Sequence, residues 1–164
     1  MNSQTLILTL GSISSDSSKN TTLKTIISSV TDIKWGDLRN IIACYSSDSS
    51  KVEAISFIVP KLTTDNKLLI EDYVSAYLPG ILNQISSDSS KVAIIRTINL
   101  HINLVAPETL VAMVNTISSD SSKVDAINLL APSMKATTSN IIRTILPVGL
   151  SPNSGCQTRV WTYH

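Results

Sequence analysis

The sequence predicts an all-α protein, a helical-repeat array in which pairs of helices are joined at corners of one recurring sequence. Two observations lead to this fold class. The hexapeptide Ser-Ser-Asp-Ser-Ser-Lys occurs four times, at 14–19, 46–51, 86–91 and 118–123, with its lysines 32, 40 and 32 residues apart. On both sides of every copy, apolar residues recur at spacings of three, four and seven, which is typical of one face of an α-helix. An identical motif at such a period indicates structural repetition.

The helix before each hexapeptide is predicted by counting back from the large residue that precedes the motif. That residue is Ile13, Tyr45, Ile85 or Ile117. Seven positions earlier stand Leu6, Leu38, Leu78 and Leu110, and three positions earlier stand Leu10, Ile42, Leu82 and Val114. The shared spacing places these side chains on one helical face.

The helix after each hexapeptide is predicted in the same way, counting forward from the lysine. Four positions on stand Leu23, Ile55, Ile95 and Ile127, and seven positions on stand Ile26, Ile58, Ile98 and Leu130. Taken together, these patterns predict helices at 3–13, 17–30, 34–45, 49–61, 65–77, 80–85, 89–103, 107–117, 121–134 and 138–146.

A second level of repetition predicts an internal duplication. The lysines of alternate copies are 72 residues apart, and the second and fourth copies share a proline nine residues past the lysine, at Pro60 and Pro132. Two threonines follow each proline and predict the N-cap of a further helix. We therefore expect one helical-repeat domain over 1–146, made of a duplicated 72-residue module at about 1–77 and 78–146. An extended tail over 147–164 follows it.

The hexapeptide itself predicts a helix start. Serine and aspartate are preferred N-caps because a short side-chain oxygen accepts from the exposed N–H groups of the first turn, and an acidic residue suits the positive end of the helix dipole. Which residue of each pair is the N-cap stays open, and we expect the four copies to be equivalent. The candidate caps are Ser15, Asp16, Ser47, Asp48, Ser87, Asp88, Ser119 and Asp120.

Exposed N–H groups, hydroxyls and a lysine at a helix start also describe an anion cradle. The possible anion contacts are Lys19, Lys51, Lys91 and Lys123. A calcium loop is excluded, because each copy holds one carboxylate and lacks the turn glycine of an EF-hand. A capped helix start explains the same residues more simply than an anion site does.

The motif resembles a family of small helical-repeat domains of unknown function whose units carry a Phe-x-Ser-Asp-x-x-Lys-like signature before a helix. The matching residues are 85–91 and their three equivalents. Isoleucine or tyrosine stands where that signature has phenylalanine. The resemblance implies a helical array and implies no chemistry.

Composition narrows the class of function. The chain has 164 residues and a formal net charge of +1, which suits one domain and disfavours a dedicated nucleic-acid binder. Cys44 and Cys156 are expected as free thiols, and His101 and His164 have no partner at metal-ligand spacing. We therefore expect an intracellular, cytoplasmic protein with no catalytic residue, no metal and no cofactor.

Helical-repeat stacks usually bind other proteins or self-assemble. We expect a non-enzymatic interaction or structural protein, bound to an unknown protein partner or to itself and not to a membrane. The alternatives are an anion- or nucleic-acid-binding module and a small intracellular enzyme. The first helix, with Leu6, Leu8 and Leu10, and the last, with Ile141, Ile142 and Ile145, are as apolar as interior helices. Ends of this kind expose patches that mark an interface, so we expect a homodimer.

Overall fold

The computed structural model describes residues 1–62, 77–101 and 107–145, with side chains over 1–62, 77–100 and 111–132. Within these ranges the chain is all-helical and contains no strand. The elements are α1 (Ser3–Gly11), α2 (Asp16–Ile26), η1 (Ile27–Ser29), α3 (Trp35–Ile42), α4 (Asp48–Ile58), η2 (Val59–Lys61), a helical run at 77–82, α6 (Asp88–His101), α7 (Pro107–Asn115) and α8 (Asp120–Ile145).

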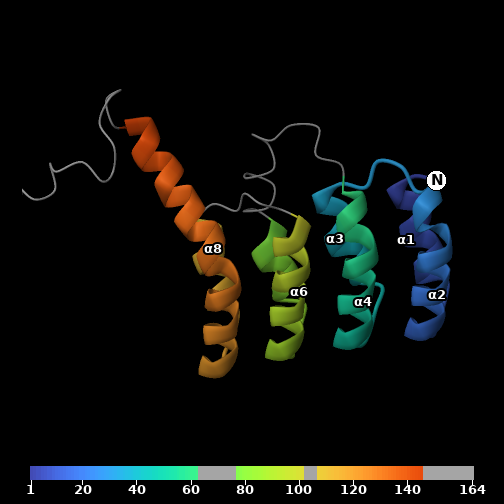
Figure 1. Ribbon diagram of the computed structural model, residues 1–164. Coiled ribbons are helices and arrows are strands. Elements are labelled where there is room, and N and C mark those ends of the chain that lie inside the picture. The colour runs from blue at the N-terminus through green and yellow to red at the C-terminus, as the bar shows by residue number, and fades with distance from the viewer. Residues whose placement is uncertain (63–76, 102–106, 146–164) are drawn as a thin grey trace, which may run out of the picture.

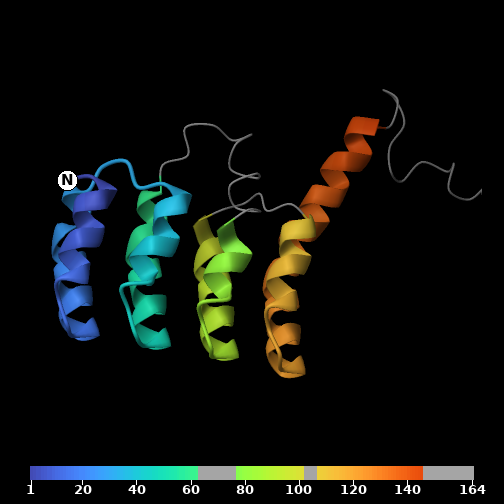
Figure 2. The same cartoon turned by 180° about the vertical axis from the view of Figure 1, so that it is seen from behind.

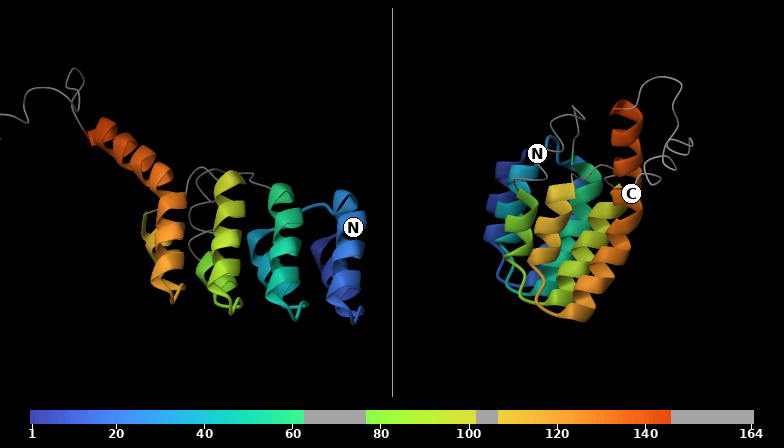
Figure 3. Two further views of the ribbon diagram at one scale, coloured as in Figure 1. Left: turned by 60° about the horizontal axis from the view of Figure 1, so that its bottom comes forward. Right: turned by 90° about the vertical axis from the view of Figure 1, so that its left-hand side faces the viewer.

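The helices form two layers (Figures 1 and 2). Helices α2, α4, α6 and α8 lie side by side, each in contact with the next, and α1, α3, the run at 77–82 and α7 form the second layer. Each helix of the second layer makes a hairpin with the helix that follows it in the chain. The four hexapeptides form the bends of these hairpins and gather along one edge of the row (Figure 3).

The core lies between the two layers. The residues seven and three positions before Ile13, Tyr45 and Ile85 are all fully buried: Leu6, Leu38, Leu78, Leu10, Ile42 and Leu82. The residue four positions after the lysine is also buried in the first three copies: Leu23, Ile55 and Ile95. The helical period of the sequence is therefore the period of burial in the structure. Leu8, on the opposite side of α1, is 65% exposed.

The expected break between helices at 121–134 and 138–146 is wrong. Helix α8 continues from Asp120 to Ile145 with Pro132 inside it. A proline removes one N–H from the helix and its ring presses on the preceding turn, which can bend a helix without ending it. Helix α8 bends partway along its length and leaves the line of α6 (Figure 1). At Pro60, by contrast, the α-helix has already ended: α4 stops at Ile58 and the proline lies within η2.

The expected helix at 80–85 starts too late. Helical residues run over 77–82 and include Pro79, and the N–H groups of Gln84 and Ile85 turn back to the carbonyls of Ile81 and Leu82. Proline is compatible with the first turn of a helix, so it does not mark the boundary there. Residues 65–76 of the expected helix at 65–77 lie outside the described residues, as does the expected tail at 147–164.

No helix in the described ranges is both long and apolar enough to cross a membrane.

Burial on α1 gives a matched pair of substitutions. Leu6 is fully buried and Leu8, two residues away on the same helix, is 65% exposed. Leu6→Ala is expected to lower the free energy of unfolding by about 2–5 kcal/mol, through lost burial and the cavity left behind. Leu8→Ala is expected to change it by less than about 0.5 kcal/mol. Urea unfolding followed by circular dichroism measures both, and equal effects would contradict the packing described for α1.

Candidate functional site: the row of hexapeptide corners

Each hexapeptide starts a helix in the same way. The second serine accepts a hydrogen bond at its Oγ from the N–H three residues on: Ser15 from Ser18, Ser47 from Ser50, Ser87 from Ser90 and Ser119 from Ser122, at 3.3–3.4 Å. Ser15 and Ser47 are the N-cap residues of α2 and α4. The aspartate that follows is the first helical residue, where its charge suits the helix dipole.

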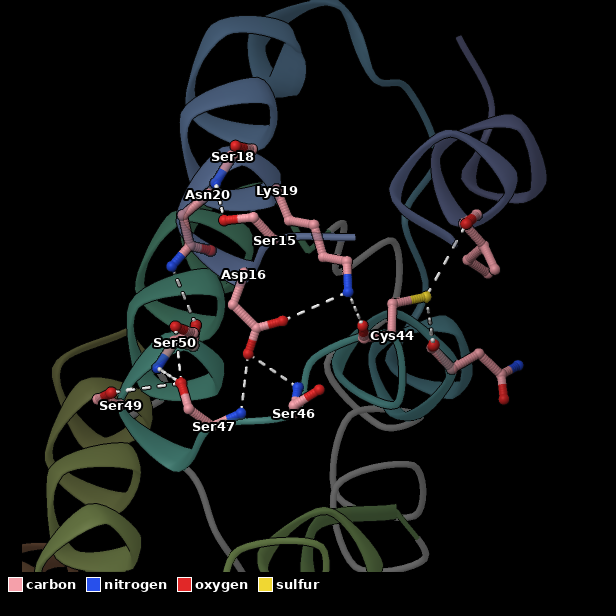
Figure 4. A network of polar contacts seen from close by, with 12 residues as sticks. Ser15, Asp16, Ser18, Lys19, Asn20, Cys44, Ser46, Ser47, Ser49 and Ser50 are labelled. Carbon is pink, nitrogen blue, oxygen red and sulfur yellow. Dashed lines mark hydrogen bonds and ion pairs between the residues drawn. The ribbon is translucent and has the colours of Figure 1, made fainter. Parts of the chain in front are cut away.

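The aspartate carboxylate does not cap the helix; it points to the next hexapeptide and accepts hydrogen bonds from it (Figure 4). Asp16 Oδ2 accepts from the backbone N–H groups of Ser46 and Ser47, both at 2.8 Å. The same pair of bonds recurs twice along the row. Asp48 accepts from Ser86 and Ser87 at 2.9 and 2.8 Å, and Asp88 accepts from Ser118 and Ser119 at 3.1 and 2.8 Å.

The lysine of each hexapeptide completes the contact. Lys19 Nζ lies 3.3 Å from Asp16 Oδ1 and donates to the carbonyl of Cys44, two residues before the next hexapeptide. Lys51 lies 3.9 Å from the carboxylate of Asp48 and donates to the carbonyl of Gln84 at 2.9 Å.

The third lysine repeats the arrangement. Lys91 lies 3.5 Å from the carboxylate of Asp88 and donates to the carbonyl of Thr116. We call this set of contacts a corner junction: the aspartate and lysine of one hexapeptide with the two serine N–H groups and the carbonyl of the next.

The buried lysines of the corner junctions have the polar partners that a buried charge needs. Lys19 and Lys91 are only 6% and 7% exposed, and a buried ammonium is costly unless it is paired and hydrogen-bonded. The carboxylate and the carbonyl supply those partners. The ion pair in turn has its carboxylate satisfied by two N–H groups, so every charged atom of the junction has a polar contact.

The contacts of the corner junction lower the pKa of two of the aspartates. Burial raises the pKa of Asp16, but the N–H groups of Ser47 and Ser46 and the Lys19 ammonium outweigh it, so the pKa lies below its ordinary value. At Asp88 the N–H of Ser119 has the largest effect and lowers the pKa; burial opposes it, and Ser118 and Lys91 lower the pKa further. Both carboxyls therefore favour the charged form in the folded chain.

The first junction has additional contacts. Asn20 Nδ2 donates to Glu53 Oε2 at 2.7 Å and to the carbonyl of Ser50 at 3.3 Å, which ties α2 to α4. The Lys19 ammonium lies 5.7 Å from the centroid of the Tyr45 ring, within the range of a cation–π contact. Burial raises the pKa of the Tyr45 hydroxyl and keeps it neutral.

The fourth hexapeptide differs from the other three. Asp120 is exposed, and its carboxylate has no hydrogen bond or ion pair within the described part of the chain. Lys123 is half-buried, and its ammonium likewise has none there. Within the described part of the chain, the contacts of the fourth copy therefore differ from those of the other three. The carboxylate of each of the first three copies bonds to the copy that follows.

Among the remaining candidate residues, the structure describes the side chain of Cys44. Cys44 is a half-buried free thiol whose Sγ contacts the carbonyls of Asn40 and Ile7 at 3.5 and 3.9 Å, and burial raises its pKa. His101 is the last residue of α6, and its side chain lies outside the described residues, as do Cys156 and His164. Across the described ranges, no three potential ligands cluster as a metal site.

The corner junction predicts unequal effects for two identical substitutions. Asp48→Ala removes the acceptor of two N–H groups and the partner of Lys51, and is expected to cost about 1.5–3 kcal/mol of unfolding free energy. Asp120→Ala removes only a favourable charge at a helix start and is expected to cost less than about 1 kcal/mol. Thermal and urea unfolding of the two variants compares them directly. Equal losses would mean that the carboxylates act only within their own helix.

The lowered pKa values of Asp16 and Asp88 predict a loss of stability in acid. Because their pKa is lower in the folded chain than in the unfolded one, about 3.9, the two carboxylates stabilise the fold above pH about 4. That stability disappears as the pH falls through the folded pKa. In urea unfolding between pH about 6 and about 2, the wild-type curve should fall more steeply than that of the double variant Asp16→Asn, Asp88→Asn. Parallel curves would contradict the assignment.

The chain matches no family model, and the comparisons with curated proteins and with solved structures also gave no match. The likeness to helical repeats with a Phe-x-Ser-Asp-x-x-Lys-like signature is thus a likeness of motif.

Proposed function

We propose that this chain is a non-enzymatic scaffold, a helical-repeat protein that acts by binding another protein or a further copy of itself. The observation that carries the proposal is the corner junction. It uses the polar groups of the hexapeptide to join one hairpin to the next, and its geometry recurs at three successive corners. A contact of this kind builds an extended surface from similar pieces, which is how helical-repeat proteins bind their partners.

The repeat architecture and the duplicated module belong to the same proposal. The first and third junctions are alike: their lysines are buried and lie 3.3 and 3.5 Å from the aspartate. The second is looser, with a half-buried Lys51 at 3.9 Å. Alternation of a tight and a looser junction supports duplication of a two-hairpin module.

Exposed apolar side chains support a protein as the partner. Large apolar residues on the described surface stand on α1, α6, α7 and α8: Leu8, Leu100, Val111, Val124 and Ile127. Three of the five lie on the last hairpin. Apolar side chains that remain in contact with water are stabilised by burial against a partner. The free thiol of Cys44 supports a cytoplasmic setting.

The alternative, an anion- or nucleic-acid-binding module, draws less support from the corners. The ammonium groups of Lys19, Lys51 and Lys91 already lie against a carboxylate and a carbonyl. Binding a phosphate with any of them would break a junction. Of the four hexapeptide lysines, Lys123 is therefore the one that would have to bind the anion.

Capture from the native cell tests the proposal. The tagged full chain is crosslinked in place, the recovered protein partner is purified, and its binding is measured at salt concentrations from about 0.05 to about 0.5 M. We expect a stoichiometric protein partner, or the chain itself, with affinity that changes little with salt. Recovery of nucleic acid, with affinity that falls steeply with salt and is lost in Lys123→Ala, would contradict the proposal and favour the alternative.

A further inference from the structure

We propose that the outer face of the α7–α8 hairpin binds the first hairpin of a second copy, head to tail, through a fourth corner junction. This inference rests on the proposed function, because it names a second copy of the chain as the partner. It follows from two observations at the ends of the row, one apolar and one polar.

The apolar observation is a change of exposure at equivalent positions. The residue four positions after the lysine is buried at 0–1% exposure in the first three copies, where the next hairpin covers it, but Ile127 is 47% exposed. One position after the lysine, Val92 is 7% exposed and Val124 is 55% exposed. The last hairpin thus presents the side chains that the earlier hairpins bury against a following hairpin, and nothing in the described part of the chain covers them.

The polar observation is that the two ends of the row are complementary. At the last corner, the carboxylate of Asp120 and the ammonium of Lys123 have no partner in the described part of the chain. At the first corner, the N–H groups of Ser14 and Ser15 hold the places of Ser46 and Ser47, and no described carboxylate accepts from them. The donors missing at one end are present at the other.

The carbonyl that the lysine needs is also present. Lys19, Lys51 and Lys91 each donate to the carbonyl two residues before the next hexapeptide. In the first hairpin that place is held by the carbonyl of Ser12. A second copy therefore offers Asp120 and Lys123 every backbone group that an internal junction uses.

The receiving face of the first hairpin makes the proposed contact weaker than an internal junction. Ile41 and Ala54 of the second hairpin are fully buried. At the equivalent positions the first hairpin has Thr9 and Thr22, both half-buried. The C-terminal part of α8 also turns outward, toward the side on which the second copy binds (Figure 1), so the contact is confined to the part of α8 next to the corner. A smaller and more polar contact binds more weakly than an internal junction does.

The arrangement is open-ended. The contact joins two different faces, so each added copy leaves one face of each kind free, and the assembly grows unless its rotation closes a ring. It therefore differs from a homodimer with two-fold symmetry, in which the same face is used twice.

Sedimentation velocity of the full-length chain from about 1 to about 300 µM tests the inference. We expect the average mass to rise with concentration past that of a dimer. Asp120→Ala is expected to weaken the association by at least about tenfold, because it removes the acceptor of two charge-assisted hydrogen bonds. The matched control is Asp125→Asn, an exposed carboxylate on the same helix that is outside the corner. A folded wild-type chain that stays monomeric throughout overturns the inference.

Two variants with one blocked face each make the test specific. Ile127→Glu blocks the outer face of α8, and Thr22→Glu blocks the receiving face of α2. With circular dichroism showing both folded, each alone should be monomeric, and equal amounts mixed should form a dimer that grows no further. Association of Thr22→Glu by itself would overturn the inference in favour of a symmetric contact between outer faces. A monomeric wild-type chain that retains a different protein partner also overturns it, and leaves the proposed function standing.

Discussion

The bond from an aspartate carboxylate to the backbone of the following hexapeptide is the contact on which the row of hairpins depends. Apolar burial holds helices together, but it is non-directional and tolerates sliding and rotation. Two N–H groups that share one carboxylate oxygen, as Ser46 and Ser47 share Asp16 Oδ2, define both a distance and an orientation. With that contact in place, α4 has one position against α2, and the side chains between the two layers have one packing.

The lysine extends the same constraint to the helix before the corner. The ammonium of Lys19 donates to the carbonyl of Cys44 and also lies beside Asp16. The end of α3 and the start of α4 are therefore both held in position relative to α2. The buried charges are thus connectors, and their desolvation is offset only when the whole set is assembled. A hairpin that docked without its corner in register would leave the lysine without its carbonyl acceptor and the carboxylate without its two N–H donors.

Much of this architecture is readable from the sequence, for a physical reason. Burial in a layered helical protein follows the period of the helix, so Leu38, Ile42 and Ile55 reveal their role by spacing alone. The hydrogen bonds from Ser46 and Ser47 to Asp16 cannot be predicted from the local sequence, because an aspartate at this position is equally typical of a helix cap. One signal was available: serine alone suffices to cap a helix, so an aspartate and a lysine at constant places in four copies need a further explanation.

The effect of a proline on a helix and the exposure of the last hairpin could not be predicted from the sequence pattern, because both depend on what packs around the residue. Pro60 lies in η2, just after the α-helix has ended, and Pro132 lies inside a continuous α-helix, although both stand nine residues after a lysine. The outcome is decided by what packs around the turn and not by the proline. The exposure of Ile127 likewise cannot be seen in its sequence position, which is the same as that of Ile95; it follows from being the last hairpin of the described row.

The unequal spacing of the hexapeptides has an evolutionary consequence. The second and third copies are 40 residues apart and the others 32, yet Asp48 meets Ser86 and Ser87 just as Asp16 meets Ser46 and Ser47. The hexapeptides lie along one edge of the row, whereas the helix ends that lead into the links between hairpins lie at the opposite edge (Figure 3). Length changes in those links are therefore uncoupled from stacking. Such a chain can gain or lose residues at one edge, and acquire new binding loops there, while the other edge keeps its register.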